Sequence, residues 1–337
     1  MRQDFCQMRA MIKKVQDLKF LLIILFLAFA NVTQAQDYSK VDNMVGNYPK
    51  SFSSPEKLAE QVNADFTSET DKARAIFTWI GSNIRYDLRE FNSGGNAIAF
   101  KYSSEQEKIQ KEIKFRYDLA NKTLRSKKGV CQGYTALFHV VCDLAKIKCI
   151  DIPGTSKTHP SHIGKLPKAS DHVWNAVKVG DDWKLIDVTW ASGAVNTQSG
   201  KFVPEFNDAY FFTNPEVMFL NHFPDDKRML MTDKTPEEFA DLPLYYGDYI
   251  KSDYEITSPD TGILVLGKAN VIPFKITNFP ANQQISYMFT GEGIVKLAQA
   301  KTNGNETEFE VRLDSKSKGY LTIYVNNKSV VSYKIQR

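Results

Sequence analysis

Three side chains in the middle of the chain could together carry out nucleophilic chemistry. Cys131 begins a segment with helical periodicity, His172 opens a stretch with strand character, and Asp187 lies in the next such stretch. A cysteine at the start of a helix gains from the helix dipole and from free N–H groups, which stabilise a thiolate and can bind an oxyanion. Such a thiolate attacks carbonyl carbon atoms when a histidine acts as its base and a carboxylate orients that histidine.

Each of these residues also has a structural interpretation when it is taken alone. A cysteine on an apolar helix is usually a small core residue, a histidine at a strand start is usually exposed, and an aspartate often caps a turn. The joint occurrence of Cys131, His172 and Asp187 in this order, at a helix start and in a hairpin, favours catalysis. Gly129 and Gly133 flank the cysteine, and we expect them to let a substrate backbone approach it closely.

The sequence also predicts how the histidine and the aspartate meet. Residues 172–179 and 183–190 are predicted as two strands of a hairpin, separated by Gly-Asp-Asp. If the first two of these turn residues are the central residues of a type II′ turn, Asp187 faces Trp174, and His172 lies on the same face at a backbone diagonal of about 7 to 8 Å. A turn centred one residue later would double the offset and separate the pair.

The other histidines show no comparable arrangement. His139 falls within the helical segment, where burial and hydrogen bonding are expected, and His222 has no evident partner. His159 and His162 are spaced H-x-x-H in a loop that contains proline and glycine. A metal site needs further ligands and a helix or turn to orient them, so we predict neither a metal site nor a cofactor.

Several predicted helices must position the cysteine. Residues 55–84 predict two helices, the second with apolar residues at the three-and-four spacing of one buried face, and Thr70 or Asp71 could cap it. Residues 103–128 are rich in Lys, Glu and Gln and predict an exposed helix. Residues 129–145 predict a helix that is buried along a broad stripe. The stripe consists of Tyr134, Leu137, Phe138, Val141 and Ala145.

The remaining pattern predicts an α+β fold in two parts. A strand at residues 148–155 and the hairpin complete the first part. Beyond about residue 250 short alternating runs are separated by turn residues, which is typical of a β-sandwich of about 80 residues, immunoglobulin-like in size. We therefore predict a catalytic domain at residues 36–250 and an all-β sandwich domain at residues 251–337.

The first 35 residues have the features of a secretory signal peptide. Five basic residues precede the apolar run 20–30, and small and polar residues follow up to Ala35. The apolar run is shorter than the about 20 residues of a transmembrane helix. The alternative is an uncleaved amphipathic anchor. We expect an exported chain, in the periplasm, at the cell surface or secreted, with no stable membrane span once residues 1–35 are removed.

Composition excludes several classes of protein. The 337 residues include 43 Lys+Arg, 39 Asp+Glu and 42% hydrophobic residues, unlike a collagen, a disulfide knot, a disordered tail or a polytopic membrane protein. Without residues 1–35 the chain keeps 38 basic and 37 acidic residues, a net charge of +1, which gives no support to a nucleic-acid partner. The cysteines left are Cys131, Cys142 and Cys149, so at least one thiol is unpaired within the chain. We predict the last two as core residues.

The segments around the three candidate residues resemble the transglutaminase-like superfamily, the papain-related group of Cys-His-Asp enzymes. GVCQGY around Cys131, DHVWNAV around His172 and WKLIDVTW around Asp187 resemble its three sequence blocks in the right order. Residues 77–87 and 210–226 resemble the subgroup that includes kyphoscoliosis peptidase and related cytokinesis proteins. The resemblance covers about residues 55 to 230.

The resemblance implies a papain-like core with Cys131 as nucleophile, His172 as base and Asp187 as the orienting carboxylate. It implies attack on a peptide or Gln carboxamide carbonyl, giving a thioester that water or an amine resolves. Tyr86 falls where some relatives place a side chain that helps to hold the oxyanion. Arg125 stands where papain carries a glutamine, and no acidic cluster resembles the calcium sites of animal transglutaminases.

Two functional hypotheses follow. The first is an exported thiol enzyme that acts on a protein or peptide substrate, more by hydrolysis than by crosslinking. The second is a catalytically silent module that binds proteins or cell-wall peptides through the same cleft. In both, we expect the C-terminal β-domain to position the substrate or to contact a cell-envelope partner. A purely structural surface protein would make the three sequence blocks coincidental.

Overall fold

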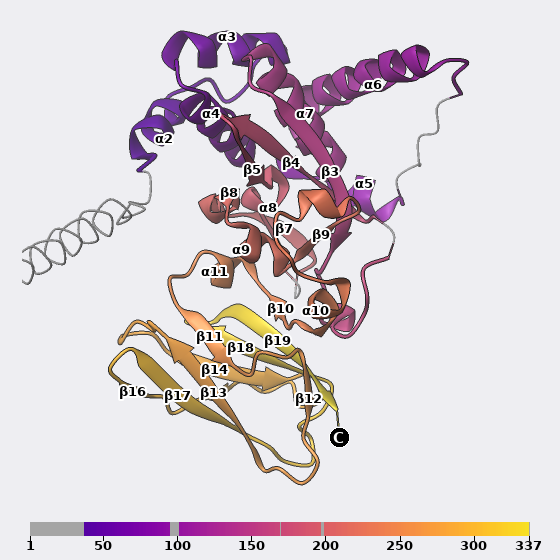
Figure 1. The fold of residues 1–337 in the computed structure, drawn as a ribbon. Coiled ribbons are helices and arrows are strands. Elements are labelled where there is room, and N and C mark those ends of the chain that lie inside the picture. The colour runs from indigo at the N-terminus through magenta and orange to yellow at the C-terminus, as the bar shows by residue number, and fades with distance from the viewer. Residues whose placement is uncertain (1–36, 95–100, 169, 197–198, 337) are drawn as a thin grey trace, which may run out of the picture. The chain divides into compact units, whose positions relative to one another are not determined.

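The structure is a computed structural model that describes residues 37–94, 101–168, 170–196 and 199–336 (Figure 1). The described residues from Val41 onward belong to one compact unit. The predicted signal peptide and Cys6 lie outside the described residues, so export stays a prediction. Among the residues described, no helix is long and apolar enough to cross a membrane.

The N-terminal helices are α2 (Ser39–Gly46), α3 (Pro55–Asp65) and α4 (Glu69–Asn83). The predicted apolar face of α4 is buried. The prediction of its cap was wrong, because Ser68 is the N-cap and its side chain accepts a hydrogen bond from the backbone N–H of Asp71. A serine before the first turn satisfies one of the free N–H groups there.

Helix α6 (Glu105–Ser126) occupies the predicted charged segment and packs against α7 (Cys131–Leu144). Figure 1 shows α6 extending away from the rest of the fold. Only three of its residues are fully buried, all in its C-terminal half: Ala120, Thr123 and Leu124. Every residue of the predicted stripe of α7 is buried, so the helix that begins at Cys131 lies in the core.

Helix α7 packs on a five-stranded antiparallel sheet. The strand order is β8-β5-β4-β3-β9. The strands are β3 (Cys149–Ser156), β4 (His172–Val179), β5 (Asp182–Ile186), β8 (Phe211–Thr213) and β9 (His222–Pro224). The strand predicted at residues 183–190 ends at Ile186, because α8 (Val188–Ala191) follows directly and Asp187 is its N-cap.

Shorter elements complete this part of the chain. The helical ones are α5 (Leu88–Asn92), η1 (Pro160–His162), η2 (Asp208–Tyr210), α9 (Pro215–Phe219), η3 (Lys227–Met229), α10 (Pro236–Asp241) and α11 (Gly247–Ile250). The strands β1 (Arg85–Tyr86) and β2 (Lys128–Gly129) pair in parallel, and β6 (Gly193–Asn196) pairs with β7 (Lys201–Pro204).

The C-terminal part consists of two antiparallel sheets, apart from one parallel edge strand, which bury a common apolar core. One sheet contains β10 (Leu244–Tyr245), β19 (Lys328–Gln336), β18 (Tyr320–Val325), β14 (Ile285–Phe289) and β15 (Lys296–Leu297), with β12 (Ile263–Val265) parallel to β19. The other contains β11 (Glu255–Ser258), β13 (Val271–Thr277), β17 (Glu306–Arg312) and β16 (Lys301–Asn303). Across the core, the Phe274 and Tyr333 ring centroids lie 5.5 Å apart.

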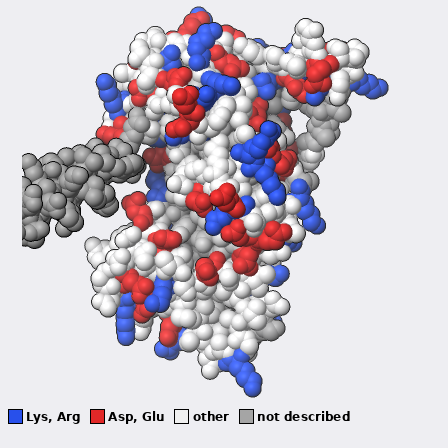
Figure 2. Space-filling model, viewed as in Figure 1, with Lys and Arg blue, Asp and Glu red and all other residues white. Residues whose placement is uncertain are grey.

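The predicted α+β fold, a cysteine helix on an antiparallel sheet followed by a β-sandwich, is therefore confirmed. Strand β10 lies before residue 251 but belongs to the sandwich sheet through its pairing with β19. The domain boundary and the immunoglobulin-like character of the sandwich stay predictions. On the face drawn in Figure 2, acidic and basic side chains of the described residues are interspersed.

Candidate active site

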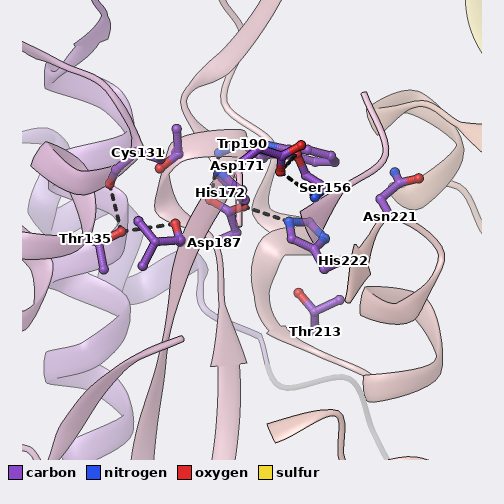
Figure 3. Close-up of polar contacts among 12 residues, drawn as sticks. Cys131, Thr135, Ser156, Asp171, His172, Asp187, Trp190, Thr213, Asn221 and His222 are labelled. Atoms are coloured by element: carbon purple, nitrogen blue, oxygen red, sulfur yellow. Dashed lines mark hydrogen bonds and ion pairs between the residues drawn. The ribbon is translucent and has the colours of Figure 1, made fainter. Parts of the chain in front are cut away.

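The hairpin of β4 and β5 has the predicted register. Asn175 pairs with Ile186 and Val179 pairs with Asp182. Gly180 has φ 58°, as the first central residue of a type II′ turn requires. The register brings Nε2 of His172 to 2.7 Å from Oδ2 of Asp187, with both side chains buried (Figure 3).

Asp187 is held through its second carboxylate oxygen and through its backbone as well. Its Oδ1 accepts a hydrogen bond from the backbone N–H of Trp190, at 3.0 Å, and so caps α8. Its own backbone N–H donates to the carbonyl of Tyr210, also at 3.0 Å. A carboxylate that accepts several hydrogen bonds keeps its charge and a single orientation. The capping interpretation and the catalytic interpretation of this aspartate are therefore compatible.

His222 is a member of the site that the sequence interpretation missed. Its Nε2 lies 3.0 Å from Oδ2 of Asp187, and its ring is buried, so the prediction that it lacks a partner was wrong. Strand β9 pairs with β3, and Ser156 stands opposite His222. The three-residue length of β9 and its nonlocal pairing left no periodic signal; only the resemblance of residues 210–226 pointed to this stretch.

The three buried groups influence each other's pKa. Burial lowers the pKa of His172, but the charge of Asp187 and the hydrogen bond with it outweigh burial and raise this pKa. Burial raises the pKa of Asp187, but the two histidines outweigh it and hold this pKa low. Burial lowers the pKa of His222. The arrangement therefore favours a carboxylate, a neutral His222 that donates its Nε2 proton, and a readily protonated His172.

Cys131 is the first residue of α7 and is buried. Its side chain is among the groups that raise the pKa of His172, which places it within electrostatic reach of that ring. Because Nε2 of His172 is hydrogen-bonded to Asp187, Nδ1 is the ring nitrogen that remains to exchange a proton with a thiol. The Thr135 hydroxyl lies 2.8 Å from the Cys131 carbonyl and 3.2 Å from the Val173 carbonyl, and so ties the first turn of α7 to β4 (Figure 3).

The other cysteines lie away from these groups. Cys142 and Cys149 are buried, as predicted for core residues. All three cysteines of the described chain are free thiols.

Tyr86 lies close to the cysteine segment. In the β1–β2 pair it stands opposite Gly129, two residues before Cys131. Burial raises the pKa of the Tyr86 phenol, and Cys131 and Asp187 add to this effect. The phenol therefore stays protonated at neutral pH, and its hydroxyl remains a hydrogen-bond donor. Its predicted role toward an oxyanion stays a prediction.

The glycines near Cys131 serve packing instead of substrate approach. A Cβ atom on Gly133 would lie 2.5 Å from Oγ1 of Thr123, and one on Gly129 would lie 3.2 Å from Cγ2 of the same residue. Thr123 belongs to α6, so the missing side chains let α6 pack closely on the start of α7. The space that we expected a substrate backbone to use is occupied by the protein itself.

Among the described residues, His172, Asp187 and His222 form the set of side chains that could hold a metal ion. Their nitrogen–oxygen distances of 2.7 and 3.0 Å are hydrogen-bond distances. A zinc ion would need about 2.0 to 2.2 Å from itself to each ligand atom and would replace both protons. The geometry thus fits two N–H donors on one carboxylate oxygen.

The remaining histidines have local partners. Nδ1 of His139 lies 2.7 Å from Oδ1 of Asp151, in agreement with its predicted burial and hydrogen bonding. Nδ1 of His159 accepts a hydrogen bond from the backbone N–H of Ser161, at 3.1 Å.

Comparisons with known proteins relate part of this chain to a known family. Residues 56–188 match the family model described as Transglutaminase-like superfamily. The chain is 28% identical to kyphoscoliosis peptidase of Mus musculus over 257 residues, which cover 75% of this chain and 35% of that protein. It is 23% identical to hillarin of Drosophila melanogaster over 303 residues, 80% of this chain and 34% of that protein. The chain thus spans about a third of the length of these curated relatives.

A solved structure described as a TGase has a TM-score of 0.29 and 15% identity, over 58% of this chain and 43% of that one. The family match includes each predicted block, since Cys131, His172 and Asp187 all lie within its limits. Residues 56–188 therefore form a domain of the transglutaminase-like superfamily.

Proposed function

We propose that this chain is an exported thiol enzyme that attacks peptide or Gln carboxamide bonds through Cys131, His172 and Asp187. The observation that carries the proposal is the buried contact of 2.7 Å between His172 and Asp187, formed beside a cysteine at the start of a core helix. A surface histidine or a simple capping aspartate would not need this burial. Similarity to kyphoscoliosis peptidase, over 75% of this chain, supports the same reaction class.

The proposed reaction has two steps. The thiolate of Cys131 attacks the carbonyl carbon, and backbone N–H groups at the start of α7 and the hydroxyl of Tyr86 stabilise the oxyanion. The imidazolium of His172 donates its proton to the leaving amine, so that the C–N bond breaks and a thioester remains. His172 then accepts a proton from water, which attacks the thioester carbonyl, so that the C–S bond breaks, the acid is released and the Cys131 thiolate is restored beside the His172 imidazolium. An amine in place of water would give a crosslink.

Alkylation of the mature protein tests the nucleophile. Treatment with iodoacetamide, followed by mass spectrometry, should show Cys131 alkylated faster than a free thiol and much faster than the buried Cys142 and Cys149. The His172→Ala variant should lose this excess, because the base no longer supports the thiolate. If Cys131 reacts no faster than a free thiol, and its alkylation rate is the same in wild type and in His172→Ala, the protein is better described as a catalytically silent binding module.

The fate of the thioester needs a separate measurement. Casein-type substrates can be incubated with a fluorescent primary amine, while ammonia release and new peptide termini are recorded. We expect new termini or ammonia with little amine incorporated, and the Cys131→Ala variant should abolish either product. Amine incorporation above the hydrolysis rate would assign crosslinking instead.

Export is proposed from residues 1–35 and can be tested in cells. A mature N-terminus near residue 36 in a periplasmic or extracellular fraction is the expected result. An intact N-terminus in the membrane fraction would favour an uncleaved anchor. The proposed cell-envelope partner of the C-terminal sandwich can be sought by crosslinking in the same fractions.

A further inference from the structure

A cavity of about 210 Å³ lies between α6 and the core of the domain, beside the start of α7. Its apolar lining comes from Phe115 and Leu119 of α6, Ala136 of α7 and Val173 of β4. The two α6 side chains are half-buried. Helix α6 therefore contributes one wall of a groove.

The groove lies beside residues of the candidate active site. Gln132, which directly follows Cys131, is part of the lining, and so is Val173, which directly follows His172. Thr135 lies in the lining too, one helical turn after the cysteine. Four residues of α-helix rise about 6 Å, which corresponds to about two residues of an extended peptide. A peptide whose carbonyl reaches Cys131 can thus place a neighbouring side chain in the groove.

Two of the three charged side chains that line the groove, Arg116 and Asp151, form an ion pair. Nε of Arg116 lies 3.2 Å from Oδ2 of Asp151. The other oxygen of Asp151 lies 2.7 Å from Nδ1 of His139 and accepts a hydrogen bond from Nδ2 of Asn175 at 3.0 Å. The remaining charged side chain of the lining is Glu112, which is exposed at the rim. An anionic substrate group would meet this extra negative charge, and a cation would compete with Arg116 for Asp151.

Size and polarity together select the occupant. An apolar cavity of about 150 Å³, engineered in another protein, binds benzene. The groove here is larger and its walls are largely apolar, so it can take a leucine or phenylalanine side chain and remove that side chain from water. A glycine would leave the groove empty and gain nothing from it.

We propose that this groove is a substrate subsite that selects a neutral apolar side chain within two residues of the attacked carbonyl. Phe115 and Leu119 of α6 are its specificity-determining residues. The proposal rests on the proposed function, because it assumes that the substrate reacts with Cys131. It gives α6 a role in substrate choice, in addition to its packing on α7.

A series of peptidyl chloromethyl ketones tests the subsite. The members differ only in the residue next to the reactive group, or only in the residue before that one. The rate of Cys131 alkylation should be at least tenfold higher with leucine or phenylalanine than with glycine at one of these positions, and lower with aspartate or lysine than with leucine. In the Leu119→Gln variant the ratio of the leucine rate to the glycine rate should fall about tenfold. Ile113→Gln is the matched control, because Ile113 lies on α6, is 50% exposed and is outside the lining.

Plain iodoacetamide separates the two proposals. If it alkylates wild type, Leu119→Gln and Ile113→Gln equally fast, the active site is intact in all three, and any loss of peptide preference belongs to the groove. If Cys131 reacts fast with iodoacetamide but the peptide series shows no apolar preference, or if Ile113→Gln changes the preference as much as Leu119→Gln, the subsite proposal is overturned. Slow alkylation of wild type by iodoacetamide would overturn the proposed function itself.

Discussion

At the scale of single residues, one carboxylate oxygen organises the site. Oδ2 of Asp187 faces Nε2 of His172 and Nε2 of His222, while Oδ1 caps α8. Because the carboxylate is fully buried, removal of either histidine would leave part of its charge without compensation. The orientation of His172 thus depends on a residue beyond the three that the sequence nominated.

The first prediction concerns the charge of His172. In Asp187→Asn the carboxylate that raises the pKa of His172 is lost, so the imidazolium should give up its proton at a lower pH, at or below about 6.5. The reagent pair iodoacetate and iodoacetamide reports this, because the imidazolium attracts only the anionic reagent. In wild type the ratio of the iodoacetate rate to the iodoacetamide rate at Cys131 should stay high as the pH rises past 6.5. In the variant the same ratio should fall as the pH rises, with its midpoint at or below about pH 6.5. An identical midpoint in both proteins would contradict the assigned cause of the shift.

The second prediction concerns His222 as a positioning residue. His222→Phe removes one N–H donor from a buried carboxylate, and we expect the alkylation rate of Cys131 to fall about tenfold, as for a hydrogen bond to a charged group. His222→Gln keeps an N–H donor and should recover most of the rate. The pH midpoint of the reagent ratio should shift in the Phe variant only. Equal loss of rate in both variants, with no shift of the midpoint, would indicate a role in packing alone.

At the scale of elements, α6 and β4 both contact the first turns of α7, the helix that begins at Cys131. Thr123 fills the space beside Gly133 that a side chain would need, and Thr135 joins the first turn of α7 to β4. A small residue at this contact brings α6 close to the cysteine. The same closeness makes α6 a wall of the groove beside the site.

The third prediction tests this contact with a double variant. Gly133→Ala places a Cβ atom 2.5 Å from Oγ1 of Thr123 and should lower the free energy of unfolding by about 1–3 kcal/mol, in the range of overpacked cores. Thr123→Ala removes the clashing atoms, so the double variant should be more stable than the sum of the single changes predicts. Urea denaturation of the four proteins measures the coupling, and strict additivity would show that the two residues do not touch.

At the scale of the whole molecule, two lysines link segments that lie far apart in the sequence. Nζ of Lys157 donates to the carbonyl oxygens of Phe239 and Leu242, at 2.6 and 2.7 Å, and its side chain is buried. Lys328 of the sandwich pairs with Glu205 and Asp248 at the surface. Strand β10 adds a backbone link, since it pairs with β19. Residues 41–337 accordingly form one compact unit.

The fourth prediction compares the two lysines. Lys157→Met removes the donor to one buried and one partly buried carbonyl oxygen and should lower the free energy of unfolding by about 1–3 kcal/mol. Lys328→Met removes two surface ion pairs of a lysine that is 49% exposed, and the change in the free energy of unfolding should stay below about 1 kcal/mol. Thermal or urea unfolding of both variants provides the measurement. A larger effect at Lys328 than at Lys157 would show that burial is not what makes the link strong.

Local patterns predicted much of this arrangement. The helix that starts at Cys131, the two hairpin strands and their register follow from periodicity and from one glycine-containing turn, because these features depend on neighbours within a few residues. The alternation beyond residue 250 predicted the sandwich for the same reason. The pairing of His172 with Asp187 was predictable because a short hairpin connects them.

The tertiary structure alone decided the rest. His222 reaches Asp187 because β9 pairs with β3, and Gly133 serves packing because α6 folds back over α7. The end of β5 at Ile186 depends in part on the backbone N–H of Asp187, which donates to the carbonyl of Tyr210. Each of these outcomes rests on segments that are distant in sequence, and sequence periodicity reports only which face of an element is buried, not which partner covers it.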